Sequence, residues 1–289
     1  MTIREFTEAT ITDAVLERVA AAPDGRVRQV SQALVKHLHA FIREIEPTEA
    51  EWEWGIRFLT TAGQVCSDTR QEFILLSDTL GVSMLVDAIN HRLPLGATET
   101  TVFGPFYVSP AEFPLGADIR GHLQGHPMHV AGRVTDAEGH PLAGATVDVW
   151  HSDADGFYDL QKLDERHRYA GRGRFQTDKD GRFHFWTIRP SPYPIPDDGP
   201  VGAMLRAQGR HPFRPEHIHF MIVAPGHRKL VTHIFAAGDK YLDSDAVFGV
   251  KTSLVEEYRV HHGGKAPDGR VIDGDWFSLD REFRLASGT

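Results

Sequence analysis

The chain has 289 residues, of which 41% are hydrophobic, and a formal net charge of -9 at pH 7. This length and composition suit a globular protein with one large domain or two modest ones, each with an apolar core. The negative charge opposes phosphate-rich partners, so we expect no nucleic-acid binding.

The single cysteine and the absence of long apolar runs limit the metal chemistry and the location. Cys66 alone cannot form an internal disulfide, an iron–sulfur cluster or a thiolate zinc site, so any metal must be bound through nitrogen and oxygen. The first residues are polar with mixed charges, and no apolar run approaches the roughly 20 residues of a membrane span. We therefore expect a cytoplasmic protein without a signal peptide or a membrane span.

Residues 1–100 are predicted to form a helical domain. From residue 26 to 45 apolar residues recur at intervals of three and four, which is the period of a helix with one buried stripe. Pro47 ends this pattern, and Thr48 with Glu51 forms a capping-box signature that begins the next helix. The helical pattern then continues almost to the end of the segment.

Residues 101–289 change to short alternating runs separated by turns, which predicts an antiparallel β-sandwich. The strand candidates are MHVAGRV, ATVDVW, GRGRFQT, RFHFWTI, HIHFMIVA and LVTHIFAA. The segments DADG and DKDG lack the glycine placement and the downstream glutamate of a calcium loop, so we interpret them as turns. The predicted fold class is α+β, with a helical N-terminal domain followed by an antiparallel β-sandwich.

The segment RPEHIHF, residues 214–220, sets His217 and His219 one residue apart. On a strand their side chains point to the same side, because side chains alternate with period two, and they are therefore candidate ligands of one metal ion. Hydrogen-bonded polar residues on a strand face are the alternative. A cupin site needs a glutamate shortly after the second histidine, and a zinc-protease helix needs two histidines four residues apart around a glutamate; neither pattern is present.

Two tyrosines stand in irregular segments that a sandwich places at its mouth. Tyr158 lies in DADGFYDL and Tyr193 lies in RPSPYPIPDDGPVG. Taken alone, Tyr158 is better explained as core at a strand end, and Tyr193 as an aromatic packed on prolines.

The stretches GFYDL, PYPIPDDGPVG and RPEHIHF, in this order and at these separations, resemble the intradiol ring-cleaving dioxygenases, the catechol 1,2-dioxygenase group. The resemblance spans nearly the whole chain and includes GPFYV at residues 104–108. It implies that the sandwich is the catalytic domain. It also implies one mononuclear non-haem Fe(III) per chain, bound by Tyr158, Tyr193, His217 and His219.

The chemistry of tyrosine ligands agrees with ferric iron. Holding a tyrosine ionised at neutral pH, against an ordinary pKa of about 10, costs roughly 4 kcal/mol. The ion must therefore be a strong Lewis acid that prefers hard anionic oxygen, so Fe(III) fits better than Zn(II). Counting charges as an aromatic diol binds makes one tyrosine an internal base, and the resemblance suggests Tyr193 for that role, although which tyrosine leaves stays open.

Arg214 and His233 are two further candidate site residues. Arg214 resembles the family arginine beside the metal, where a fixed cation stabilises negative charge that develops on the ring; an ordinary surface arginine is the alternative. His233, in VTHIF, stands where the catechol enzymes often carry glutamine. It is interpreted either as a hydrogen-bond donor near the ligands or as a structural strand histidine.

Within the family, LLSDTLG, TVFGPFYV and PYPIPDDGPVG most resemble the members that cleave hydroxyquinol (benzene-1,2,4-triol) with O2 to 3-hydroxy-cis,cis-muconate, the enol of maleylacetate. Catechol or a chlorocatechol is the alternative substrate. If Asp78 reaches the cavity it can accept a hydrogen bond from the third hydroxyl, although an aspartate on a helix faces solvent by default. The resemblance implies a substrate pocket of Leu75, Asp78, Val102, Phe103, Gly104, Pro105, Phe106, Ile195, Pro196, Arg214 and Val247.

Two other expectations concern assembly and class. Val30, Leu34, Leu38 and Phe41 offer more apolar surface than a few helices easily cover, so we expect a homodimer through the N-terminal helices. Packing of this stripe on the sandwich is the alternative, and the resemblance adds a bound phospholipid between the helices. The segment VAGRVTDAEGHPLAGATVDVW also resembles small transthyretin-like modules without chemistry, a class that leaves the tyrosines and histidines unexplained.

Overall fold

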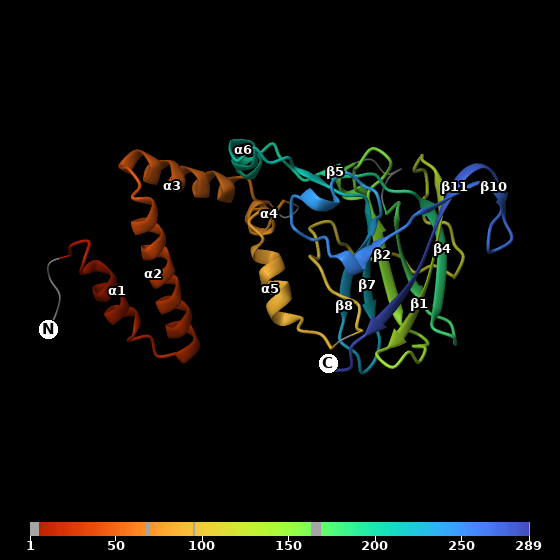
Figure 1. Cartoon of the computed structure of the whole chain (residues 1–289), viewed down its shortest axis with the longest axis horizontal. Coiled ribbons are helices and arrows are strands. Elements are labelled where there is room, and N and C mark those ends of the chain that lie inside the picture. The colour runs from red at the N-terminus through yellow and green to blue at the C-terminus, as the bar shows by residue number, and fades with distance from the viewer. Residues whose placement is uncertain (1–5, 68–69, 95, 163–168, 289) are drawn as a thin grey trace. The chain divides into compact units, whose positions relative to one another are not determined.

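The computed structural model describes residues 6–67, 70–94, 96–162 and 169–288 (Figure 1). The chain divides into two compact units, residues 1–61 and residues 62–289. Each unit is described by itself. Within the described residues no helix is long and apolar enough to cross a membrane.

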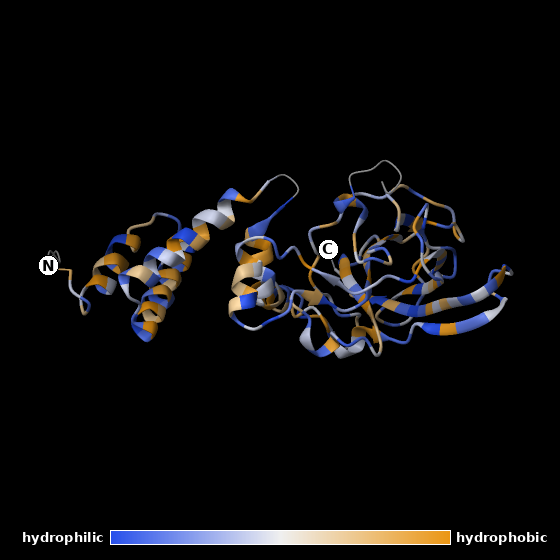
Figure 2. Ribbon diagram, turned by 90° about the horizontal axis from the view of Figure 1, so that it is seen from above, coloured by the Kyte–Doolittle hydropathy of each residue, from blue (hydrophilic) through white to orange (hydrophobic). Residues whose placement is uncertain are grey.

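The first unit is helical and contains α1 (Ile11–Val19), α2 (Gly25–Ile45) and most of α3 (Glu49–Gln64). The predicted capping box before α3 is confirmed, because the Glu51 carboxylate accepts hydrogen bonds of 2.8 Å from the backbone N–H and the hydroxyl of Thr48. Figure 2 shows hydrophobic residues interleaved with hydrophilic ones along these helices. They are therefore amphipathic, as the spacing predicts.

The apolar stripe of α2 is not covered within this unit. None of the residues of α2, all of which the structure describes, is buried. Apart from Val35, which is half-buried, its large apolar side chains are exposed, namely Val27, Val30, Leu34, Leu38, Phe41, Ile42 and Ile45. A helix with such a stripe gains most of its stability from a packing partner.

The second unit begins with two short helices and continues into sheets. The helices are α4 (Glu72–Thr79), α5 (Val82–Asn90) and, between strands, α6 (Pro200–Ala207). The strands are β1 (Pro127–Asp136), β2 (Thr146–His151), β3 (Arg172–Gln176), β4 (Arg182–Ile188), β5 (Tyr193–Pro194), β6 (Phe213–Arg214), β7 (His217–Val223), β8 (Leu230–Ala236), β9 (Val255–Glu256), β10 (Arg259–Lys265) and β11 (Val271–Leu285). Short 3-10 helices are η1 (Asp159–Gln161), η2 (Leu242–Ser244) and η3 (Thr252–Leu254).

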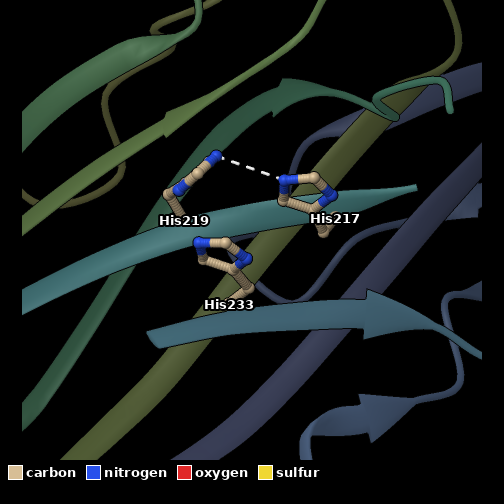
Figure 3. A group of neighbouring side chains, drawn as sticks. All are labelled: His217, His219 and His233. Atoms are coloured by element: carbon tan, nitrogen blue, oxygen red, sulfur yellow. Dashed lines mark hydrogen bonds between the residues drawn. The ribbon is translucent and has the colours of Figure 1, made fainter. Parts of the chain in front are cut away.

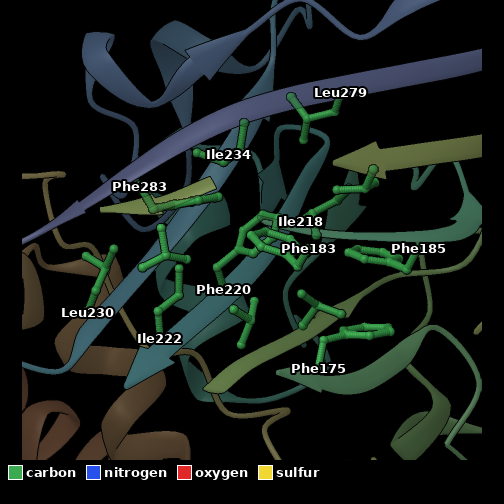
Figure 4. Close-up of a cluster of buried hydrophobic side chains, with 14 of the residues drawn as sticks. Phe175, Phe183, Phe185, Ile218, Phe220, Ile222, Leu230, Ile234, Leu279 and Phe283 are labelled. Atoms are coloured by element: carbon green, nitrogen blue, oxygen red, sulfur yellow. The ribbon is translucent and has the colours of Figure 1, made fainter. Parts of the chain in front are cut away.

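The strands form two main sheets and one small pair. Their orders are β10-β11-β1-β4, β3-β2-β7-β8-β9 and β5-β6. Apolar side chains from both main sheets fill one core, including Phe175, Phe183, Ile218, Phe220 and Phe283 (Figure 4). The predicted sandwich after a helical N-terminal region is thus confirmed.

The sheets are mixed rather than purely antiparallel. β1 pairs in parallel with β11, and β8 pairs in parallel with β9, while the other pairings are antiparallel among the described strands. A parallel pair needs a long crossover connection, so its partners lie far apart in the sequence. Local alternation predicts that these strands exist but carries no information about which distant strand lies beside them.

Candidate active site

The histidine pair lies on a central strand that is covered on both faces. β7 runs between β2 and β8, and its residues Ile218, Phe220 and Ile222 point into the core. His217 and His219 point to the other face and are 2% and 1% exposed. Their Nε2 atoms lie 3.2 Å apart, so the two imidazoles do face one point from the same side of the strand (Figure 3).

Both histidines are held in the neutral form that a metal ligand requires. His217 Nδ1 lies 2.7 Å from the Pro215 carbonyl oxygen, which assigns the proton to Nδ1 and the lone pair to Nε2. Burial, followed by the nearby Arg214 cation, holds the pKa of His217 well below its usual value. Burial, followed by His233, does the same for the pKa of His219.

Tyr158 and Tyr193 meet this pair from two other segments. Tyr158 immediately precedes η1, and its hydroxyl lies 2.9 Å from His219 Nε2. Tyr193 begins β5; its ring lies 5.2 Å from that of Tyr158 and 5.6 Å from that of His217, between centroids. Burial, and then the neighbouring Tyr193 phenol, hold the pKa of Tyr158 well above its usual value. The protonated phenol is therefore the favoured form of Tyr158 in the absence of a metal ion.

The donor atoms of Tyr158, His217 and His219 have the spacing expected of neighbouring ligands, and the Tyr193 ring lies beside them. Two nitrogen ligands held about 2.1 Å from one ion lie roughly 3.0 to 3.4 Å apart. The His217–His219 and Tyr158–His219 separations of 3.2 and 2.9 Å correspond to neighbouring ligands. Two phenols and two neutral imidazoles, without thiolate, suit a hard, strongly Lewis-acidic ion such as iron.

His233 lies beside this shell rather than in it. It faces His219 from β8, and the three histidines have nitrogens within 4.8 Å of one another. The His233 ring, however, stacks on the His217 ring at 4.7 Å and 14°. Imidazole lone pairs lie in the ring plane, so two nearly parallel stacked rings cannot both direct a lone pair at one ion. His233 Nδ1 lies 3.4 Å from Arg214 Nη2, and its Nε2 has no hydrogen-bond partner among the described residues.

Arg214 is a buried residue of the site and not a surface arginine. It lies on β6, is 2% exposed, and places Nη1 3.4 Å from His217 Nε2. Its guanidinium forms a fork with Asp245, with Nε–Oδ1 and Nη2–Oδ2 distances of 3.0 and 3.2 Å. Burial alone would lower the pKa of Arg214, but Asp245 raises it above its usual value, so the cation persists.

Asp245 is a site residue that the sequence did not reveal. Besides Arg214, its carboxylate accepts the backbone N–H groups of Val247 and Gly249 at 3.3 and 2.9 Å. The Asp245 carboxylate therefore links the Arg214 guanidinium to the loop that contains Val247. No local pattern marks it, because its partner lies 31 residues away.

Five of the expected pocket residues gather beside the tyrosines. Leu75, Val102, Ile195 and Val247 lie in one buried cluster with both tyrosines, and Phe106 packs against it. Gly104 has φ +77°, and a Cβ there would lie 3.1 Å from the His219 ring, so glycine permits this close approach. Phe103 is half exposed and packs edge-on against Trp150. Pro105 is exposed and Pro196 half-buried.

Asp78 departs from the default expectation for a helical aspartate. It lies on α4 and is 6% exposed, so it faces the interior. Burial raises its pKa, while Ser83 and Arg214 lower it. The carboxylate thus belongs to the electrostatic environment of Arg214 and Asp245.

Comparison with known proteins gives a consistent family. Residues 102–273 match the family model described as Dioxygenase, and residues 24–98 match that described as Catechol dioxygenase N terminus. The chain is 55% identical to a 6-chlorohydroxyquinol 1,2-dioxygenase from Cupriavidus pinatubonensis, over 89% of this chain and 93% of that protein. It is 53% identical to a hydroxyquinol 1,2-dioxygenase from Nocardioides simplex, over 96% and 95% respectively.

A solved structure agrees with these relatives. The crystal structure of hydroxyquinol 1,2-dioxygenase from Pseudomonas putida DLL-E4 superposes with a TM-score of 0.91 and 49% sequence identity. The match covers 97% of this chain and 99% of that one. These matches favour an enzyme over the non-enzymatic transthyretin-like module.

Proposed function

The chain belongs to the intradiol ring-cleaving dioxygenases, and we propose that it opens hydroxyquinol with O2 between the two carbons that carry adjacent hydroxyls. The product would be 3-hydroxy-cis,cis-muconate, the enol of maleylacetate. Both oxygen atoms of O2 end in this product, so no external reductant is needed. The buried group of two phenols and two neutral imidazoles beside a fixed arginine is the observation that carries the proposal.

The family uses non-haem iron, and the proposed ligands of one Fe(III) per chain are Tyr158, Tyr193, His217 and His219. Their separations and their hard donor atoms support this assignment. When bound, ferric iron withdraws electron density from the chelated diol, which opens a ring carbon to O2. The stacked orientation of His233 supports its exclusion from the ligand set.

The residues around the proposed ligands have distinct roles in the reaction. Tyr193 is proposed to accept a proton from a substrate hydroxyl at its phenol oxygen. Arg214 presents a permanent positive charge, which stabilises negative charge that develops on the ring and the incoming oxygen. Because Asp245 holds two of its nitrogens, the guanidinium keeps one orientation throughout.

Asp78 is the residue proposed to select the triol. With plain catechol the buried carboxylate would gain no new partner beside Ser83, whereas the third hydroxyl of hydroxyquinol would donate a further hydrogen bond to it. The apolar members Leu75, Val102, Ile195 and Val247, with Phe106, would hold the ring. Phe103, Gly104, Pro105 and Pro196 complete the proposed pocket.

Steady-state kinetics and colour test this function. We expect kcat/KM for hydroxyquinol to exceed that for catechol and chlorocatechol clearly, with maleylacetate as the product. The iron-loaded protein should be coloured, since tyrosinate bound to Fe(III) absorbs visible light. A clear preference for catechol would assign the alternative substrate. A colourless protein that binds no iron after ferric loading would overturn the proposal.

The proposed assembly is a cytoplasmic homodimer formed through a helical dimerisation domain, residues 1–100, with residues 101–289 as the catalytic domain. The exposed stripe of α2 supports a helical interface. A phospholipid between the helices is part of this proposal. Light scattering of the purified protein tests the dimer, solvent extraction followed by mass spectrometry tests the lipid, and cell fractionation tests the location.

A further inference from the structure

A second buried arginine, Arg172, contacts the residue that directly follows Tyr158. Arg172 begins β3 and is 1% exposed. Its Nε donates to Asp159 Oδ2 at 2.8 Å, and its Nη2 donates to Asp159 Oδ1. Asp159 directly follows Tyr158 in the chain, so this fork holds the backbone from which the Tyr158 ring projects.

The same guanidinium also holds a segment from elsewhere in the chain. Arg172 Nη1 and Nη2 each lie 3.2 Å from the Phe106 carbonyl oxygen. The Phe106 ring stacks on the Tyr158 ring at 4.5 Å and 21°. The Arg172 side chain therefore donates hydrogen bonds both to Asp159, next to Tyr158, and to the Phe106 backbone. Only a guanidinium offers enough donors in a fixed plane for both sets of hydrogen bonds.

We propose that Arg172 is a positioning residue that sets the Tyr158 phenol and the Phe106 ring as one unit against His219 Nε2. The inference rests on the proposed function, in which Tyr158 is a ligand and Phe106 lines the pocket. Tyr158 reaches His219 at 2.9 Å only if its backbone stays in place. A small displacement of groups that orient reactants is enough to lower a rate strongly.

The burial of the pair favours positioning over simple stabilisation. Replacing a buried ion pair with apolar residues is often neutral or stabilising. The reason is that transferring both charges from water into the interior during folding costs free energy that their mutual attraction only partly offsets. The Arg172–Asp159 pair is 1% and 2% exposed at its side chains. What such a pair supplies that apolar packing does not is a fixed direction for each of its hydrogen bonds.

The test compares Arg172→Lys and Asp159→Asn with a matched control on the same strand. Arg174 forms an equivalent fork with Asp148, at 2.6 and 2.7 Å, which also accepts the Tyr107 hydroxyl at 2.8 Å. Arg174→Lys thus weakens a fork of the same kind two residues along β3. Lysine keeps the charge at either position but cannot form the fork.

The first measurement needs no metal. In metal-free protein labelled with 3-fluorotyrosine, the 19F resonance of Tyr158 is identified by its absence in Tyr158→Phe. We expect Arg172→Lys and Asp159→Asn to shift or broaden this resonance, and Arg174→Lys to leave it unchanged. An unchanged Tyr158 resonance in the first two variants would overturn the proposal.

The second measurement uses the iron-loaded enzyme. We expect Arg172→Lys to bind iron, to shift the visible absorption band, and to lower kcat/KM for hydroxyquinol about ten-fold or more. Arg174→Lys should stay within about two-fold of the parent in kcat/KM and keep its band. Equal effects in both lysine variants, or loss of folding in both Arg172→Lys and Asp159→Asn, would assign Arg172 a structural role instead. If the parent were inactive and colourless, the proposed function would fail, while the metal-free 19F result would still decide the positioning.

Discussion

Substitution of Asp78 separates recognition of the third hydroxyl from the reaction itself. A hydrogen bond to a charged group contributes about 1.5–3 kcal/mol. If Asp78 accepts such a bond from hydroxyquinol, Asp78→Ala should lower kcat/KM for this substrate about 10- to 150-fold. Asp78→Asn keeps the size and one acceptor oxygen, so its loss should be smaller. Catechol has no third hydroxyl, and its kcat/KM should change by less than about three-fold.

The same side chain gives a stability test with the opposite sign. Burial raises the pKa of Asp78, with Ser83 and Arg214 opposing. A folded-state pKa above the unfolded value means that stability falls as the pH rises from the ordinary aspartate value of about 4 through the raised value. Asp78→Asn removes this penalty, so its Tm should exceed that of the parent at pH 7, and the difference should vanish near pH 4.

Two assays together test the proposed role of Asp78 in substrate recognition and its effect on stability. Steady-state rates with hydroxyquinol and catechol give the selectivity, and scanning calorimetry from pH 4 to 8 gives the Tm difference. Equal losses of kcat/KM for both substrates in Asp78→Ala would refute the recognition argument. A lower Tm for Asp78→Asn at pH 7 would refute the view that the ionised, buried carboxylate of Asp78 destabilises the folded protein.

Four other outcomes are expected. Asp245→Ala leaves the buried Arg214 cation unpaired, which should cost about 3–5 kcal/mol and lower the Tm roughly 6–20 °C by calorimetry; a fall of a degree or less would contradict a buried fork. Tyr158→Phe and Tyr193→Phe should differ in residual colour and activity, and identical losses would argue against separate roles. Leu38→Glu should convert a dimer to monomers by light scattering while kcat/KM stays within about two-fold, and a persistent dimer would place the interface elsewhere. Loading iron into metal-free protein in weak buffer should release protons, with one fewer from Tyr158→Phe.

The parts of the site that follow local patterns were predictable from the sequence. Strand alternation placed His217 and His219 on one face, and the structure gives them neighbouring Nε2 atoms. Glycine and proline punctuation marked the irregular segments that carry Tyr158 and Tyr193. These features depend on a few consecutive residues, so composition and spacing contain them.

The parts that depend on distant pairing were not predictable. Asp245 and Asp159 resemble ordinary turn or helix-start aspartates until β6 and β3 bring an arginine to each. Asp78 looks solvent-facing by helix statistics, yet α4 buries it. The parallel partner of β1 is β11, which lies more than 130 residues further along the chain. Other strands have a similar alternation of apolar and polar residues, so the sequence pattern does not show which of them pairs with β1.

The two buried arginines also bear on how the protein handles an ionised tyrosine. Burial raises the pKa of Tyr158, whereas the charges of Arg214 and Arg172 lower it. Each arginine is itself paired with a carboxylate, so its field at the phenol is reduced but not removed. The net pKa still lies well above its usual value, so the arginines offset only part of the cost of ionisation. If Tyr158 binds Fe(III) as proposed, the cation would offset the rest of this cost, and proton loss from Tyr158 would be coupled to occupation of the proposed site.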